Sequence, residues 1–253
     1  MHADIVGRAS DYLPNVTCNI TFVATSTVSS TTRNGPSTIA LKSLMAITGL
    51  IFIGFVLAHM YGNLKIFAGE AAFNEYAEHL RELGEPLLPH EGMLWILRIV
   101  LILALVGHAY SAFALWSRAS NARKSRYAVT KAAKSMFVSK AMRWGGVALL
   151  LFIVFHILHF TTNTIQVNGD YDNPADRLVS SFELWWVVLI YLFAVAALGM
   201  HLLHGVWAAG MTLGLNTSAK AAERLRIAAI LVAVVTVVGY ILPPLAILFG
   251  IIP

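Results

Sequence analysis

The stretch MLWILRIVLILALVGHAYSAFALWS, residues 93–117, decides the fold of this chain. Arg98 is its only charged residue. As a helix rising about 1.5 Å per residue, a stretch of this length crosses a hydrocarbon core of about 30 Å. Four further stretches of the same kind lie at about 42–66, 142–165, 183–211 and 226–250. Because a backbone in lipid must satisfy its own hydrogen bonds, we expect an all-α integral membrane protein with five transmembrane helices.

The composition supports a membrane protein and excludes several other classes. The chain is 58% hydrophobic and 12% charged, whereas soluble domains carry about 25% charged residues. Cys18 is the only cysteine, which excludes an intrachain disulfide and an iron–sulfur ligand set, and no dinucleotide-binding glycine motif is present. We expect residues 1–41 to be a polar cytoplasmic segment rather than a signal peptide, and residues 42–253 to form the membrane domain.

Loop charge predicts the topology. The connection between the second and third stretches has no acidic residue and is strongly basic, which places it in the cytoplasm. Its basic residues are Arg118, Arg123, Lys124, Arg126, Lys131, Lys134, Lys140 and Arg143. The connections on either side of it are acidic and therefore predicted outside, so the N-terminus is predicted to be cytoplasmic. Because these basic residues lie in short connections beside membrane stretches, we interpret them as determinants of topology. We expect no nucleic-acid partner.

Histidine recurs inside four of the five stretches, although imidazole is costly to bury in hydrocarbon without a partner. The residues are His59, His108, the pair His156 and His159, and the pair His201 and His204. With the predicted topology, His59 and His156 lie in the outer half of the membrane. His108 and His201 lie in the inner half, so the four histidines form two pairs at two depths.

Two facing imidazoles from two helices of a bundle are what a b-type haem needs for its axial positions. The two pairs therefore predict two haems and a role in electron transfer. Taken singly, each histidine could instead be a hydrogen-bonded core residue, a proton relay or a quinone contact. Zinc is disfavoured because no thiolate or carboxylate accompanies the histidines at membrane depth. His159 and His204, one turn from the candidate ligands, are interpreted as second-shell or quinone-side groups.

The sequence around these histidines resembles a known family. His59 in AHMYGN, His108 in VGHAYSAF, His156 in FHILHF and His201 in HLLHGVW are similar to the di-haem cytochrome b (b558-type) membrane-anchor subunit of bacterial succinate dehydrogenases and fumarate reductases. The resemblance covers residues from about 40 to 250. The family's histidine before Gly-x-Trp matches His201, with Gly205 and Trp207, rather than His204.

The resemblance implies a four-helix haem-binding bundle with one peripheral helix, in a multi-pass protein of the bacterial cell membrane. It implies two b haems, the outer one on His59 and His156 and the inner one on His108 and His201. It also implies flavoprotein and iron–sulfur partner subunits, which carry the succinate and fumarate chemistry, and a quinone substrate, commonly menaquinone. The fifth stretch has no histidine, and we expect it to serve packing.

The sequence leaves open which other residues contact the haems and which alternative functions apply. Arg98 and Arg143 could meet haem propionates, although Arg98 could equally snorkel to the membrane surface. Glycines within the haem-bearing stretches could admit a porphyrin or a neighbouring helix: Gly54, Gly107, Gly199 and Gly205. The alternatives in function are a di-haem subunit of another quinone-linked dehydrogenase, such as a hydrogenase or formate dehydrogenase, and a haem-free transporter or structural anchor.

Overall fold

A computed structural model describes residues 35–122, 133–169, 171 and 173–252, and these residues form only helices and their connections. The expected N-terminal segment therefore lies outside the described residues except for its last seven positions, and most of the basic connection (123–132) lies outside as well. The elements are α1 (Thr38–Leu64), η1 (Lys65–Ala68), α2 (Glu70–Glu82), α3 (Gly92–Asn121), α4 (Ala133–His156), the π-helical turn η2 (Ile157–Thr161), α5 (Pro174–Phe182), α6 (Trp185–Thr212) and α7 (Ala219–Leu248).

Five helical segments are long and apolar enough to cross a membrane, which confirms the predicted fold class. They are Thr38–Ala68, Gly92–Asn121, Lys140–Thr161, Trp185–Thr212 and Ala219–Leu248. Large apolar side chains on their surfaces are left exposed, for example Leu103 and Val106 of α3 at 65% and 62%. Such surface is expected where a helix faces lipid.

The helix boundaries differ from the predicted stretches by several residues. The Ser37 hydroxyl accepts the Ala40 N–H at 3.1 Å, so α1 begins at Thr38 rather than 42. The Ser218 hydroxyl caps α7 in the same way through the Ala221 N–H, so α7 begins well before 226. Hydropathy detects the apolar core of a helix, whereas the capping residue determines where it begins.

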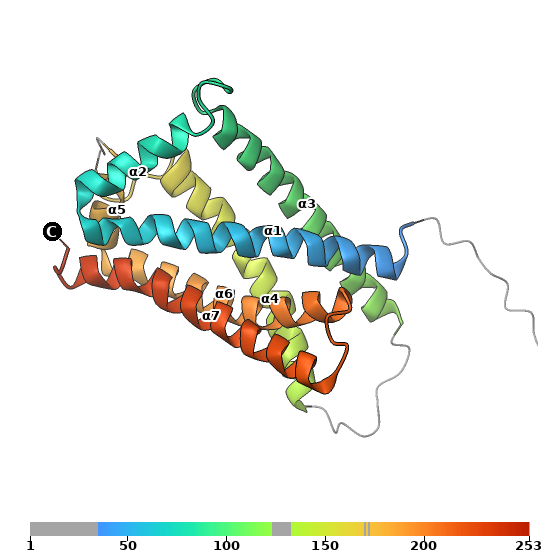
Figure 1. The fold of residues 1–253 in the computed structure, drawn as a ribbon. Helices are drawn as coiled ribbons and strands as arrows, with labels where there is room; N and C mark the ends of the chain where they lie inside the picture. The colour runs from blue at the N-terminus through green and yellow to red at the C-terminus, as the bar shows by residue number, and fades with distance from the viewer. Residues whose placement is uncertain (1–34, 123–132, 170, 172, 253) are drawn as a thin grey trace, which may run out of the picture. The chain divides into compact units, whose positions relative to one another are not determined.

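The two acidic connections contain helices, α2 and α5, where the sequence analysis expected loops. The Asn173 side chain accepts the N–H groups of Ala175 and Asp176, and Pro174 occupies the first turn of α5, where it needs no hydrogen-bond donor. Asn74 of α2 joins the two helices through Asn173 Oδ1 at 2.9 Å and through the Ala175 N–H at 3.0 Å. We call the end of the molecule that carries these two helices the α2/α5 end (Figure 1).

Three of the spanning helices, α1, α6 and α7, pack against one another, and α3 and α4 pack against this group. α6 and α7 pack along each other, α1 packs against α3, α6 and α7, and α4 packs mainly against α6 (Figure 1). Among the described residues, α1 with α4 and α3 with α6 are not closely packed pairs. A buried apolar cluster at the α2/α5 end contains Phe182 of α5, Tyr191 of α6 and Ile247 of α7. This cluster holds the end of α4 in place, because Phe152, Phe155 and Phe160 pack against it.

Candidate functional site

The first pair of intramembrane histidines lies toward the α2/α5 end. His59 of α1 and His156, the last residue of α4, have ring centroids 5.8 Å apart and planes at 82°. Their helices do not pack closely, so the two side chains bridge a separation between helices. Phe55 stacks on the His59 ring at 5.3 Å, and Phe152 stacks on the His156 ring at 5.7 Å. Neighbouring aromatic rings therefore restrain both imidazoles.

The second pair lies past the middle of α3 and α6, toward the opposite end. The ring centroids of His108 and His201 are 6.1 Å apart, with planes at 54°. A Cβ added at Gly49 of α1 would lie 3.5 Å from Cε1 of His108, and one at Gly146 of α4 would lie 3.8 Å from Cε1 of His201. These two glycines, which the sequence analysis did not name, therefore leave room beside the two rings.

The four glycines named from the sequence separate into two kinds. Nothing lies within 4 Å of a Cβ added at Gly54 or Gly205, so these positions are open. Gly107 faces Leu44 and Thr48 of α1, and Gly199 faces Val237 of α7. Gly107 and Gly199 therefore serve helix packing.

The separations of both pairs suit a metal held between two imidazoles. A metal–nitrogen bond of about 2 Å on each side, with each centroid about 1.1 Å behind its nitrogen, places the two centroids about 6 Å apart. Among the described residues, no group of three or more His, Cys, Asp or Glu side chains could hold a metal by itself. Two imidazoles fit an ion whose remaining ligands come from a porphyrin. Nδ1 of His201 is buried without a hydrogen-bond partner in that part of the chain, so this ring is free to engage another group.

Hydroxyl groups contact one histidine of each pair. The Thr48 hydroxyl lies 3.1 Å from Nδ1 of His108, and the Tyr191 hydroxyl lies 3.3 Å from Nδ1 of His156. Sequence reasoning missed both contacts because each hydroxyl lies far along the chain from its histidine. A polar residue within an apolar stretch was the available signal.

His159 is completely buried and both of its ring nitrogens are engaged. Nδ1 lies 3.1 Å from the Tyr191 hydroxyl and Nε2 lies 3.0 Å from the Ser181 hydroxyl. The Tyr191 hydroxyl therefore links His159 to His156, and His159 itself is not a member of the pair. His204 lies on α6 one turn beyond His201 and is exposed, whereas His159 is buried.

The two arginines named from the sequence lie at opposite ends of the molecule. At the α2/α5 end, Arg98 has Nη1 3.7 Å from Glu91 Oε2 and its guanidinium carbon 4.8 Å from the Trp95 ring centroid. At the opposite end, the guanidinium carbon of Arg143 lies 5.5 Å from the Trp116 ring centroid. Their role toward propionates stays a prediction.

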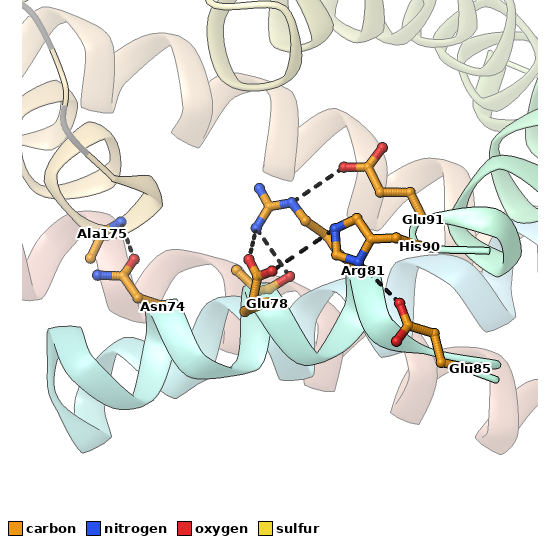
Figure 2. Close-up of polar contacts among 8 residues, drawn as sticks. Asn74, Glu78, Arg81, Glu85, His90, Glu91 and Ala175 are labelled. Atoms are coloured by element: carbon orange, nitrogen blue, oxygen red, sulfur yellow. Dashed lines mark hydrogen bonds and ion pairs between the residues drawn. The ribbon is translucent and has the colours of Figure 1, made fainter.

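Glu91 connects Arg98 to a polar network at the end of α2. Figure 2 shows Arg81 between Glu78 and Glu91, at 2.9 and 3.4 Å. His90, which the sequence analysis did not assign a role, lies 3.1 Å from Glu85 and 4.0 Å from Glu78. Each of these side chains is exposed to 32% or more, so we expect their ion pairs to contribute little to stability.

Residues 117–241, just under half of the chain, match the model of a family described as the succinate dehydrogenase/fumarate reductase transmembrane subunit. This match supports a membrane-anchor subunit of such a complex. The matched segment contains His156 and His201, whereas His59 and His108 precede it. With five helical segments long and apolar enough to span a membrane among its described residues, the chain is a multi-pass membrane protein. Comparisons with curated proteins and with solved structures gave no match.

Proposed function

We propose that this chain is the cytochrome b membrane-anchor subunit of a succinate:quinone oxidoreductase, and that it binds two b-type haems through its two histidine pairs. One observation carries the haem assignment. In each pair, two imidazoles on helices that do not pack closely lie with their centroids about 6 Å apart, the separation estimated for two axial ligands. The family match supports the assignment to this complex.

His59 and His156 would hold one haem, and His108 and His201 the other. A haem held by two histidines would supply one-electron transfer. The chain's own residues supply binding and orientation. Aromatic rings restrain the first pair, and glycines of the two other histidine-bearing helices leave space beside the second. The two pairs lie at different depths in the bundle, so together they would carry electrons along it.

The partners follow from what the chain lacks and from its charge. With one cysteine and no dinucleotide motif, it needs a flavoprotein and an iron–sulfur subunit for the succinate and fumarate chemistry. The basic connection between α3 and α4 is the proposed docking face for the iron–sulfur subunit, and the positive-inside rule favours a cytoplasmic position for it. A bacterial cell membrane is the location that the family resemblance implies. The acidic α2/α5 end then faces outward, and membrane quinone, commonly menaquinone in the family resembled, is the proposed electron partner.

The test is a reduced-minus-oxidised absorption spectrum of the complex purified from membranes, with haem content measured per anchor subunit. We expect b-type bands and two haems. His59→Ala and His201→Ala should each remove one haem and leave the other. His79→Ala is the matched control, because His79 is an exposed histidine of α2 outside both pairs, and should retain two haems.

The outcomes separate the alternatives. Absence of b-type bands from an assembled complex would leave a haem-free anchor and overturn the haem assignment. Loss of one haem from His204→Ala, with two retained in His201→Ala, would move the ligand by one turn. A di-haem protein that co-purifies with a hydrogenase or formate dehydrogenase, and not with succinate dehydrogenase subunits, would contradict the assignment to this complex.

A further inference from the structure

The two hydroxyl contacts form a crossed arrangement. Thr48, which contacts His108, belongs to α1, the helix that carries His59 of the other pair. Tyr191, which contacts His156, belongs to α6, the helix that carries His201 of the other pair. Each pair is therefore contacted by a hydroxyl from a helix that bears a ligand candidate of the other pair.

The direction of the Thr48 contact follows from its other neighbours. The Thr48 hydroxyl lies 2.7 Å from the carbonyl oxygen of Leu44 and 3.2 Å from that of Met45. Carbonyl oxygens only accept, and a hydroxyl has one hydrogen, so Thr48 donates to its own helix. Its oxygen then accepts from His108, and the imidazole hydrogen of His108 lies on Nδ1.

The direction of the Tyr191 contact is fixed from the far side of His159. The Ser181 hydroxyl donates to the carbonyl oxygen of Arg177, so it accepts from Nε2–H of His159. His159 is completely buried among apolar rings, where an unpaired charge is costly, and an uncharged imidazole has one N–H. Nδ1 of His159 therefore accepts the Tyr191 hydrogen.

The single hydroxyl hydrogen of Tyr191 is thus donated to His159, so the Tyr191 oxygen accepts Nδ1–H of His156. The hydrogen bonds thus run in one direction from His156 through Tyr191, His159 and Ser181. Both contacted rings reach the same state, with hydrogen on Nδ1 and a free lone pair on Nε2. The side-chain hydrogen bonds of these two rings with Thr48 and Tyr191 both involve Nδ1.

We propose that Thr48 and Tyr191 are positioning residues, which fix His108 and His156 with hydrogen on Nδ1 and so leave Nε2 of each free to bind haem iron. The proposal rests on the proposed haem function. A ligand imidazole that donates its other N–H to an oxygen becomes a stronger electron donor and favours oxidised iron. Each hydroxyl therefore lowers the midpoint potential of one haem, and Ser181 acts on the same haem as Tyr191.

The experiment is a potentiometric titration of the b-band absorbance in the purified complex, together with haem content per subunit. Thr48→Val and Tyr191→Phe remove the hydroxyls and keep the side-chain shapes. We expect each variant to raise the potential of a different haem and to weaken haem retention at that site by about 10-fold or more. Each variant is the control for the other, since its second haem should titrate as in the unaltered complex.

Two further variants separate positioning from packing. Ser181→Ala removes a hydroxyl that is separated from His156 by Tyr191 and His159 in the hydrogen-bond chain, and it should shift the midpoint potential of the same haem as Tyr191→Phe. Thr48→Ser keeps the hydroxyl and should restore the original potential. If Thr48 and Tyr191 served packing alone, their variants would lower thermal stability and would not shift the midpoint potential of one haem selectively. If Thr48→Val fails to assemble, Thr48→Ala tests the same hydroxyl without adding a methyl group.

The failures are distinguishable. An unaltered complex without b-type bands overturns the haem function itself. Two haems in the unaltered complex, with both potentials and both haem contents unchanged in Thr48→Val and Tyr191→Phe, overturn the positioning roles alone. A shift of the same haem by both variants contradicts the assignment of one hydroxyl to each pair.

Discussion

The Tyr240 hydroxyl of α7 donates to the carbonyl oxygen of Val56 in α1 at 2.8 Å. The bond lies within one turn of His59, whose ring centroid is 6.1 Å from that of Tyr240. The one spanning helix without histidine thus contributes to holding a helix that carries one, in keeping with the packing role expected of it.

Tyr240→Phe should lower the thermal stability of the subunit slightly. It removes one interhelical hydrogen bond, which in membrane proteins contributes about 0.6 kcal/mol, and keeps the ring. Thermal unfolding in detergent, followed by circular dichroism, measures the change. Tyr110→Phe is the matched control, because Tyr110 is 52% exposed on α3, and an equal loss in that variant would contradict the assignment.

Gly199→Ala should destabilise the contact between α6 and α7. A Cβ at Gly199 would lie 2.5 Å from Cγ2 of Val237, and the branched valine has little freedom to move away in a helix. Overpacking of this kind costs about 1–3 kcal/mol. Gly54→Ala, which adds the same methyl group where nothing lies within 4 Å, should not lower the unfolding temperature. Indistinguishable unfolding temperatures for the two variants would refute the packing role.

Asn173→Ala should loosen the α2/α5 end. The Asn173 side chain caps α5 and accepts from Asn74 of α2, and loss of a cap costs about 1 kcal/mol. Hydrogen exchange measured by mass spectrometry should quicken in peptides from α5. Asn216→Ala, in the exposed connection between α6 and α7, supplies the control and should leave α5 exchange unchanged.

Arg118→Gln should increase fraying at the start of α1. The Arg118 guanidinium donates to the carbonyl oxygen of Pro36 at 2.7 Å and to the Thr38 hydroxyl at 3.0 Å, and so ties the end of α3 to the first turn of α1. The expected result is faster exchange of the first amides of α1. Arg224→Gln removes an exposed arginine of α7 and should have no such effect; unchanged exchange in both variants would count against the tie.

The spanning helices could be predicted because long apolar stretches have one solution in lipid, and the structure confirms all five. Depth along each helix, read from loop charge, named the pairs His59 with His156 and His108 with His201, and these are the rings that the structure brings together. Their role as haem ligands stays a prediction.

Two features could not be read from hydropathy. α2 and α5 are short and partly polar, so hydropathy does not detect them. Asn173 before Pro174 is nevertheless a helix-start signal in the sequence. The surroundings of His159 depend on Tyr191 and Ser181, which lie 32 and 22 residues further along the chain. Spacing within one helix cannot show which face meets another helix.

The crossed pairing of helices also bears on the order in which the protein can be completed. His59 of α1 must wait for α4 before it has a partner ring, while His108 of α3 must wait for α6. Because synthesis proceeds from the N-terminus, the pair nearer the α2/α5 end is complete while the other still lacks one member. His201 is the last of the four to leave the ribosome, so His108 of α3 has no partner ring until most of the chain has been made and α6 has entered the bilayer.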